Sequence, residues 1–458
     1  MLNIISLDLL ATTSEHGYSL DELVYRTQQL FETEGMAGFV SLVLELTDEK
    51  LCSDILRNGK TKFTAGHCDN PRYQLHDKVP RQFRTSVGVV RIRWRRLKCM
   101  NCGGSSIPLR YFLGLEPYQS KSSELEQMVV EVVSEQSYRR STRHLGDIGS
   151  IPIPRSTAHR WVAESDCDQL ETNRENLDVL MADGTGYKRR PDRAADLNNR
   201  GELRVTMGVD KQGNLIPLGA FSGESWENIA EKIKNDMKKD PPLADVLVSD
   251  GERGLVNSLG SLCKQAQRCH WHIVRDLNYT MWQDKAPKKE RDSRKHDLTA
   301  ILGIEIPEEE IEVVNEEDSE NIIERLQESE KRITELISSL ADKGYNTAAD
   351  YVKRASRNMF SYVRRWLRTG IVTPRVSSLI ERMMREIARR LKRIAFGWSE
   401  EGAAKMAQVI IKRITSAGEW EKYWKNKLRI EGNVVLTLNS IRHKSPQTLG
   451  RSPQTLGR

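Results

Sequence analysis

The sequence lacks long apolar runs. None of its 458 residues falls in a stretch that approaches the roughly 20 apolar residues needed to span a bilayer. The opening residues MLNIISLDLLATTSEHG also lack the basic region with which a secretory signal peptide begins. We therefore expect a cytoplasmic protein with no membrane partner. The chain is too long for one ordinary core, so two to four domains are expected.

Cysteine is scarce and odd in number. Seven cysteines with a single C-x-x-C pair argue against a disulfide framework and for reduced thiols or metal. The pair, Cys99 and Cys102, has the spacing of half a zinc ribbon, and the glycines after it permit the tight turn. The other half has only His67 and Cys68, with Cys52 further away. A complete zinc site and a degenerate ribbon held by packing therefore remain open.

Two blocks of the chain lack acidic residues altogether. Residues 81–110 carry eight Arg or Lys and residues 351–375 carry seven. In contrast, residues 301–330 hold twelve Asp or Glu against one Arg. Basic blocks interleaved with Trp, Tyr and Phe suit a polyanion such as double-stranded DNA, whose phosphates attract cations and release counterions on binding. Solvated charged faces are the alternative for any single block.

Shifts in pattern along the chain predict a mixed α/β protein with several regions. In chain order, these are a helical N-terminal region (1–60), a zinc-ribbon-like β region (61–115), a helix-turn-helix-like region (116–170), the first part of an α/β core (177–287), an all-helical insertion (288–370), the final core helices (371–440) and a disordered tail (441–458) that contains the tandem repeat SPQTLGR.

Three short helices are expected within residues 121–165. The break GSIPIP separates the last two, and Pro154 stands just ahead of the third, a favoured position for proline. This pattern is typical of a helix-turn-helix, although a plain helical hairpin fits equally well. In a helix-turn-helix, the third helix would offer these residues to a major groove: Arg155, Ser156, Thr157, His159 and Arg160.

Two apolar strands of the expected core end in aspartate. LDVLMADG brings Asp183 and ADVLVSDG brings Asp250 to a strand end. The carboxyl ends of adjacent parallel strands converge, and two carboxylates packed together repel unless a divalent cation lies between them. Glu381, on a later amphipathic helix, would complete a cage for two Mg²⁺ ions about 4 Å apart. Each acid alone is equally compatible with an ordinary turn, so the prediction depends on the ordered set.

The series MADGTGY, SDGERGL, CHWH and SSLIERMMREIARR resembles the DDE transposases of bacterial insertion sequences, in the branch related to Mutator elements. The resemblance covers about residues 60–440 and implies a ribonuclease-H-like core with an all-helical insertion between the second Asp and the Glu. Here 131 positions separate Asp250 from Glu381. The family's Cys-x-x-His signature is matched by Cys269 and His272. The upstream stretch FRTSVGVVRIRWRRLKCMNCGG resembles the family's ribbon, although the expected first C-x-x-C is reduced to GHC.

The cluster CHWH admits three interpretations. A zinc site would need four ligands, and the nearest other thiol in sequence is Cys263. A Cys–His nucleophile would leave the strand-end acids unexplained. We favour a structural role in which Cys269 and His272 brace the sheet beside the acids, with a DNA contact by His272 as a second option.

The resemblance implies a transposase that binds the terminal inverted repeats of its insertion sequence, cuts the DNA at their ends and joins the 3′-hydroxyls to target DNA. Asp183, Asp250 and Glu381 would be the catalytic residues and would bind Mg²⁺ or Mn²⁺. Additional DNA contacts are expected from Lys188, beside Tyr187, and from three arginines near Glu381: Arg382, Arg385 and Arg389. A homodimer or larger synaptic assembly and association with the nucleoid are also expected. The alternatives are a non-catalytic DNA-binding protein derived from a transposase and a general ribonuclease-H-like nuclease.

Overall fold

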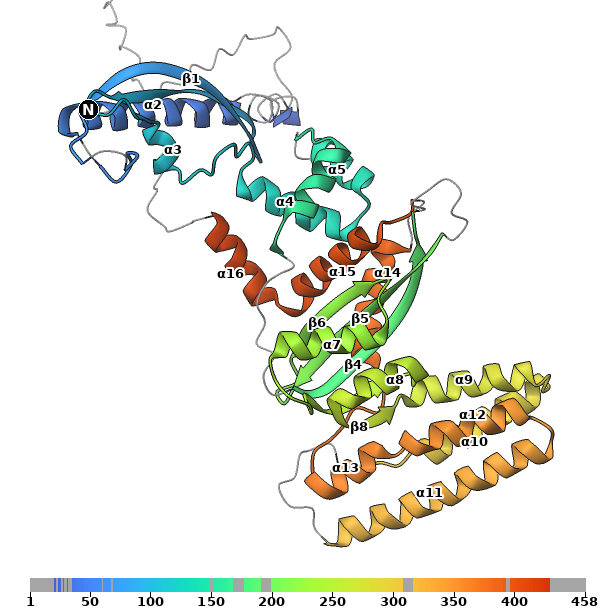
Figure 1. Cartoon of the computed structure of the whole chain (residues 1–458). Helices are drawn as coiled ribbons and strands as arrows, with labels where there is room; N and C mark the ends of the chain where they lie inside the picture. The colour runs from blue at the N-terminus through green and yellow to red at the C-terminus, as the bar shows by residue number, and fades with distance from the viewer. Residues whose placement is uncertain are drawn as a thin grey trace, which may run out of the picture.

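The computed structural model describes residues 35–59, 61–66, 69–147, 151–167, 177–190, 199–307, 316–392 and 396–428, with a few single residues between 20 and 31. The candidate zinc ligands His67 and Cys68 and the tail at 441–458 lie outside these residues. The molecule is elongated, with an N-terminal hairpin unit at one end, an α/β unit in the middle and a helical bundle at the other end (Figure 1).

The N-terminal unit is a long β-hairpin covered by one helix. Strands β1 (Tyr73–Thr85) and β2 (Gly88–Cys99) pair antiparallel, and helix α2 (Met36–Asn58) packs on β2. The two-residue strand β3 (Ser105–Ser106) and the short helix α3 (Pro108–Phe112) follow. Alternation along β2 buries its apolar side chains against the helix and exposes Arg91 and Arg93.

Three helices follow in the expected places: α4 (Ser123–Glu135), α5 (Tyr138–Asp147) and α6 (Arg155–Glu164). Ser122 caps α4 by accepting the N–H of Leu125 at 3.3 Å, and Pro154 immediately precedes α6. Helix α6 packs against both others and buries Ala158 and Trp161. The helix-turn-helix interpretation of this region stays a prediction.

The central sheet has five strands in the order β6-β5-β4-β7-β8. Strand β5 pairs antiparallel with β4 and β6, whereas β7 is parallel to β4 and β8. This mixed α/β arrangement is compatible with a ribonuclease-H-like core. The bounds are β4 (Leu177–Lys188), β5 (Arg200–Asp210), β6 (Leu215–Ser222), β7 (Ala244–Ser249) and β8 (Cys263–Arg268).

Two strand bounds differ from the sequence prediction. Strand β4 does not end at Asp183 but continues to Lys188, because it keeps pairing with β5 after its parallel pairing with β7 stops at Met181. GLVNSLGSLC predicts a helix and AQRCHW a short strand, but strand β8 begins at Cys263 and ends at Arg268, so His270 already belongs to a helix.

Alternate residues of the sheet face different helices. Val179, Met181 and Val248 share a core with α14 (Ser378–Leu391) and α15 (Glu400–Thr415). Leu180 and Leu247 share a core with α7 (Trp226–Met237) and α8 (Arg253–Leu259) on the other face. Because side chains alternate along a strand, Asp183 and Asp250 continue the series that faces α14.

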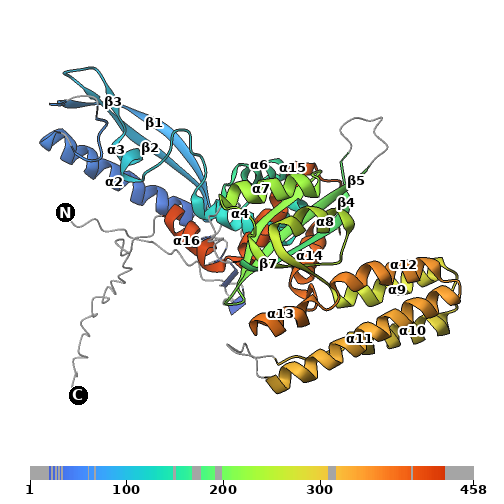
Figure 2. The same cartoon turned by 60° about the horizontal axis from the view of Figure 1, so that its bottom comes forward.

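Helices form the rest of the described chain. A bundle with its own apolar core comprises α9 (His270–Gln283), α10 (Lys288–Leu302), α11 (Glu316–Asp342), α12 (Asn346–Ala355) and α13 (Ser361–Thr369). This bundle lies beyond the β8 edge of the sheet (Figure 1), and Figure 2 shows it at the end of the molecule away from the N-terminal hairpin. Helix α16 (Ala417–Leu428) follows α15 and packs on α4. Among the described residues, no helix combines the length and apolar character of a membrane span.

Candidate functional site

The acids expected from the sequence come from β4, from the residue after β7 and from α14, on one face of the sheet. The parallel register pairs Met181 with Val248, and two residues further along the two strands come Asp183 and Asp250. Both acids are half-buried. Burial raises the pKa of Asp183 to about 6, and the negative charges of Asp250 and Glu381 add to the rise, against the N–H of Gly184 that donates to Asp183. Both other carboxylates therefore lie within electrostatic reach of Asp183.

The loop that carries Asp250 is held in one conformation. Asp250 Oδ1 accepts the backbone N–H of Glu252 at 2.9 Å, which forms a turn just before α8. Gly251 has φ +79°, and a Cβ built on it would lie 1.1 Å from an Arg268 guanidinium nitrogen. The positive φ favours glycine here, whereas the Arg268 guanidinium is the flexible end of a side chain that lies against the loop and could move aside.

Glu381 sits in the first turn of α14, beside the residues that cap the helix. Ser377 precedes this helix but makes no side-chain bond to its backbone. Its hydroxyl instead donates to Glu381 Oε1 at 2.8 Å. His272 Nδ1 lies 3.8 Å from the same oxygen, and the Ser377 N–H and Oγ lie 3.4 and 3.3 Å from Cys269 Sγ. Cys269, just before α9, and His272, in its first turn, thus pack directly against Glu381.

This cluster alters the titration of its members. Burial would raise the pKa of Cys269, but hydrogen bonds from His272 and Ser377 hold it below its ordinary value. Burial would lower the pKa of His272, but contact with Cys269 raises it above its ordinary value. Among the described residues, the group of three metal-ligand types whose ligand atoms all lie within 4.8 Å of one another is Cys269, His272 and Glu381. The three acids are spaced more widely than that.

The residues expected to contact DNA are at the surface. On α6, all but the half-buried Thr157 are exposed: Arg155, Ser156, His159 and Arg160. The centres of the His159 and Tyr138 rings lie 5.3 Å apart, with the two rings tilted by 48°. On α14, the exposed face opposite the buried one carries Arg382, Arg385 and Arg389. Arg389 is paired with Glu386 at 3.0 Å. None of these side chains is part of a hydrophobic core.

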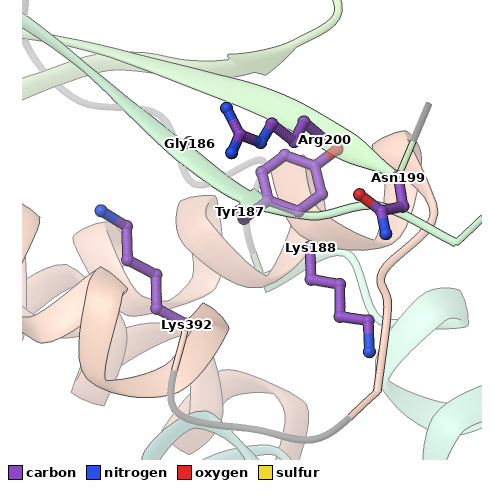
Figure 3. A pocket seen from close by; sticks show the side chains of 6 residues that line it. All are labelled: Gly186, Tyr187, Lys188, Asn199, Arg200 and Lys392. Atoms are coloured by element: carbon purple, nitrogen blue, oxygen red, sulfur yellow. The ribbon is translucent and has the colours of Figure 1, made fainter.

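A basic hollow lies at the far end of β4. Figure 3 shows the side chains around this cavity of about 500 Å³, which come from β4, the start of β5 and the end of α14. Lys188, Arg200 and Lys392 supply three cations, and the Tyr187 hydroxyl lies 2.7 Å from Ser222 Oγ. The remaining lining residues are Gly186 and Asn199. A hollow of this charge suits a phosphate group.

The C-x-x-C pair forms a tight turn at the end of β2. Cys99 is buried and Cys102 is exposed, and Gly103 takes φ +74°. Burial opposes the change, but N–H groups of Cys102 and Asn101 lower the Cys99 pKa to about 7, which favours a thiolate. The Met100 N–H donates to Arg72 O at 2.7 Å, so residue 72 lies beside the turn. Zinc binding here stays a prediction.

Sequence reasoning missed an aromatic stripe on α9. Trp271, Tyr279 and Trp282 are 53%, 56% and 64% exposed, although large aromatic rings are usually buried. The Arg275 guanidinium lies 5.1 Å from the centre of the Trp271 ring, and its pKa is raised, against burial, by Asp276 first and also by Asp250. The recurrence of aromatic and basic residues at positions 271, 275, 279 and 282 is a helical spacing visible in the sequence.

The fold and the site together define a mixed α/β protein with acids on two neighbouring strands and a packed helix, and with a helical insertion between two of these acids. The family model described as "Transposase, Mutator family" matches residues 81–422. The chain therefore belongs to the Mutator family of transposases, which are enzymes of mobile elements that cleave and transfer DNA. None of the curated proteins matches the chain.

Proposed function

We propose that this transposase binds the terminal inverted repeats of its own insertion sequence, cleaves the DNA at the ends and joins the 3′-hydroxyls to target DNA. The observation that carries the proposal is the convergence of Asp183, Asp250 and Glu381 from β4, β7 and α14 onto one face of the sheet. The match to the Mutator family supports the reaction class. The acids would be the catalytic residues.

The three carboxylates have the chemistry of a magnesium site. All their donor atoms are hard oxygens, the ligands that Mg²⁺ and Mn²⁺ prefer. Burial first, and then the charges of Asp250 and Glu381, raise the pKa of Asp183; a divalent cation would favour its charged form, which supports the proposal. When bound, two such ions activate the attacking oxygen and stabilise the leaving oxygen in phosphoryl transfer.

The rest of the chain supplies residues for holding DNA. We propose that Lys188 in the basic hollow and the exposed Arg382, Arg385 and Arg389 of α14 bind phosphates of the cleaved strand. The exposed residues of α6 named above would contact the element end. Because both ends must be held for joining, a homodimer or larger synaptic assembly is proposed by analogy.

The test is end cleavage by the full chain. Purified protein is incubated with labelled element ends and Mg²⁺, and cut and joined products are resolved on a gel. We expect Asp250→Asn to lower the cleavage rate at least about 1,000-fold, since the acid is required for metal-assisted phosphoryl transfer. Asp240→Asn is the matched control, because Asp240 is exposed in the loop that leads to β7. It should cleave like the wild type.

Three other results would overturn the proposal. Equal cleavage by the wild type and Asp250→Asn would remove the role of the acids. Metal-independent binding to the ends with no cutting would indicate a non-catalytic DNA-binding protein. Cutting of any DNA at equal rates would indicate a general nuclease.

A further inference from the structure

The cluster beside Glu381 has the donor set of a second kind of metal site. It presents one thiol, one imidazole nitrogen and one carboxylate oxygen, all within 4.8 Å of one another. Cys269 is fully buried and His272 nearly so. Thiolate and imidazole select borderline-soft ions such as Zn²⁺ and disfavour Mg²⁺, which takes oxygen ligands. The donors therefore differ in kind from the three acids.

Ser377 supplies the fourth corner of the cluster. Its Oγ lies 2.8 Å from Glu381 Oε1, 3.3 Å from Cys269 Sγ and 3.5 Å from His272 Nδ1, and His272 Nδ1 lies 3.8 Å from Glu381 Oε1. A tetrahedral Zn²⁺ with bonds of about 2.0–2.3 Å holds its ligand atoms roughly 3.3–3.8 Å apart. Three of these four spacings fall in this range, the Ser377–Glu381 distance is shorter, and Cys269 Sγ lies within 4.8 Å of the other two ligand atoms.

The scaffold behind these four residues is rigid. Cys269 stands at the start of α9 and Ser377 at the start of α14. The Cys269 N–H donates to Ser249 O of β7 at 2.8 Å, and the His270 N–H donates to Arg375 O at 2.9 Å. Two helix starts, brought together from positions 108 residues apart, are thus anchored to the sheet and to each other. A preformed site of this kind binds a metal without first ordering its ligands.

We propose that Cys269, His272 and Glu381 bind one Zn²⁺ ion, with Ser377 Oγ or a water as the fourth ligand. The ion binds Glu381 through Oε1, the oxygen that faces Ser377 and His272, and so leaves the other carboxylate oxygen for the acid cluster. The zinc site then holds Glu381 in position for the reaction proposed above. The prediction of a purely structural CHWH cluster becomes, in this proposal, a structural role carried by a metal.

The test uses Co²⁺, which replaces Zn²⁺ and absorbs visibly when a thiolate binds it. The full chain carries Cys99→Ser and Cys102→Ser, which remove the other candidate thiol site. Addition of Co²⁺ should give a cobalt–thiolate charge-transfer band that saturates at one ion per chain and is displaced by Zn²⁺. Cys269→Ser should abolish the band. The matched control is Cys263→Ser, six residues upstream, which should keep it.

A second variant distinguishes the loss of a metal ligand from misfolding, which could also abolish the band in Cys269→Ser. His272→Gln keeps the thiol but removes one ligand, so it should retain a weaker band with a Co²⁺ dissociation constant raised about 100-fold. Absence of the band in the parent chain, or a band that survives Cys269→Ser, would overturn the zinc proposal. Asp183→Asn should keep the band while losing DNA cleavage, so the zinc site and the proposed function fail in different measurements.

Discussion

At the scale of single residues, the acids of the site work against the stability of the metal-free fold. Asp183 is half-buried and lies near Asp250 and Glu381, so its charged form is disfavoured on two counts. Charged groups that destabilise the fold in this way are expected at functional sites, where the reaction requires them. The conflict has a measurable consequence in the dependence of stability on pH.

We expect Asp183→Asn to stabilise the metal-free protein at neutral pH. Burial and the neighbouring acids raise the pKa of Asp183 from 3.8 to about 6. Between these values the folded state binds more protons than the unfolded state. The contribution of Asp183 to the free energy of unfolding therefore falls as pH rises through this window, and its full cost is present above about pH 6. Removing the charge should recover about 1–3 kcal/mol at pH 7.5 and almost nothing at pH 4.

The measurement is thermal unfolding in EDTA at both pH values. Asp183→Asn should raise the melting temperature by a few degrees at pH 7.5 alone. Mg²⁺ should stabilise the wild type but not the variant. Asp54→Asn, which alters an exposed carboxylate of α2, is the control and should change neither value. A lower melting temperature for Asp183→Asn at pH 7.5 would contradict the electrostatic account.

At the scale of elements, part of the site could be predicted because local pattern and function coincide there. LDVLMADG and ADVLVSDG predict buried strands that lead to an acid. The parallel pairing of these strands then places Asp183 beside Asp250. The continuation of β4 could not be predicted, because Gly184 and Gly186 carry no apolar alternation and extend the strand only through pairing with β5.

Other elements depend on contacts that no local pattern contains. Strand β8 reads CKQAQR, a polar edge strand that takes its conformation from β7. The approach of Ser377 to Cys269 joins residues 108 positions apart. The family resemblance indicated that CHWH matters, but only the tertiary structure shows that it contacts Glu381.

The aromatic stripe of α9 gives a prediction for this element. Trp271 is exposed, stands next to His272 and has Arg275 over its ring, so it is placed to stack an unpaired base near the acids. We expect Trp271→Ala to weaken binding of a single-stranded oligonucleotide about 5- to 100-fold, because stacking contributes about 1–3 kcal/mol per base. Melting temperature should be nearly unchanged, since the ring covers little core.

Fluorescence anisotropy at one fixed salt concentration measures this effect. Tyr111→Ala is the matched control, because Tyr111 is another exposed aromatic residue with an arginine, Arg110, over its ring. Equal losses in the two variants, or none in Trp271→Ala, would show that α9 does not bind unpaired bases.

At the scale of the whole molecule, one buried arginine joins the helical bundle to the sheet. Arg365 of α13 bonds Asp178 of β4 and Asp245 of β7, with a guanidinium nitrogen 3.1 Å from Asp245. Both Arg365 and Asp178 are buried. Replacing the arginine leaves the buried Asp178 without this partner, whereas Asp245 keeps its ion pair with Lys264; breaking a buried pair typically costs about 3–5 kcal/mol.

Arg365→Met should therefore lower the melting temperature by several degrees and open the connection between sheet and bundle to limited proteolysis. Arg364→Met, which removes an exposed arginine paired with Glu330, is the adjacent control and should do neither. Adding Asp178→Asn to Arg365→Met should restore part of the lost stability. Identical unfolding of the two single variants would mean that this network does not hold the bundle in place.

At the same scale, the distribution of charge gives a prediction for the binding of duplex DNA. The net charge is only +7, but β2 concentrates Arg91 and Arg93 on one exposed face of the hairpin, at the end of the molecule opposite the helical bundle (Figure 1). Each phosphate contact contributes about −0.9 to the slope of log affinity against log salt concentration. The double change Arg91→Ala and Arg93→Ala should therefore make the slope shallower by about 1–2 and weaken binding of all duplex sequences alike.

The control removes two exposed lysines outside the basic blocks, Lys211 and Lys239, and should leave the slope as in the wild type. A shallower slope in the control alone would place the DNA on the sheet and not on the hairpin. The measured slope thus decides whether the long N-terminal hairpin is a DNA-binding arm.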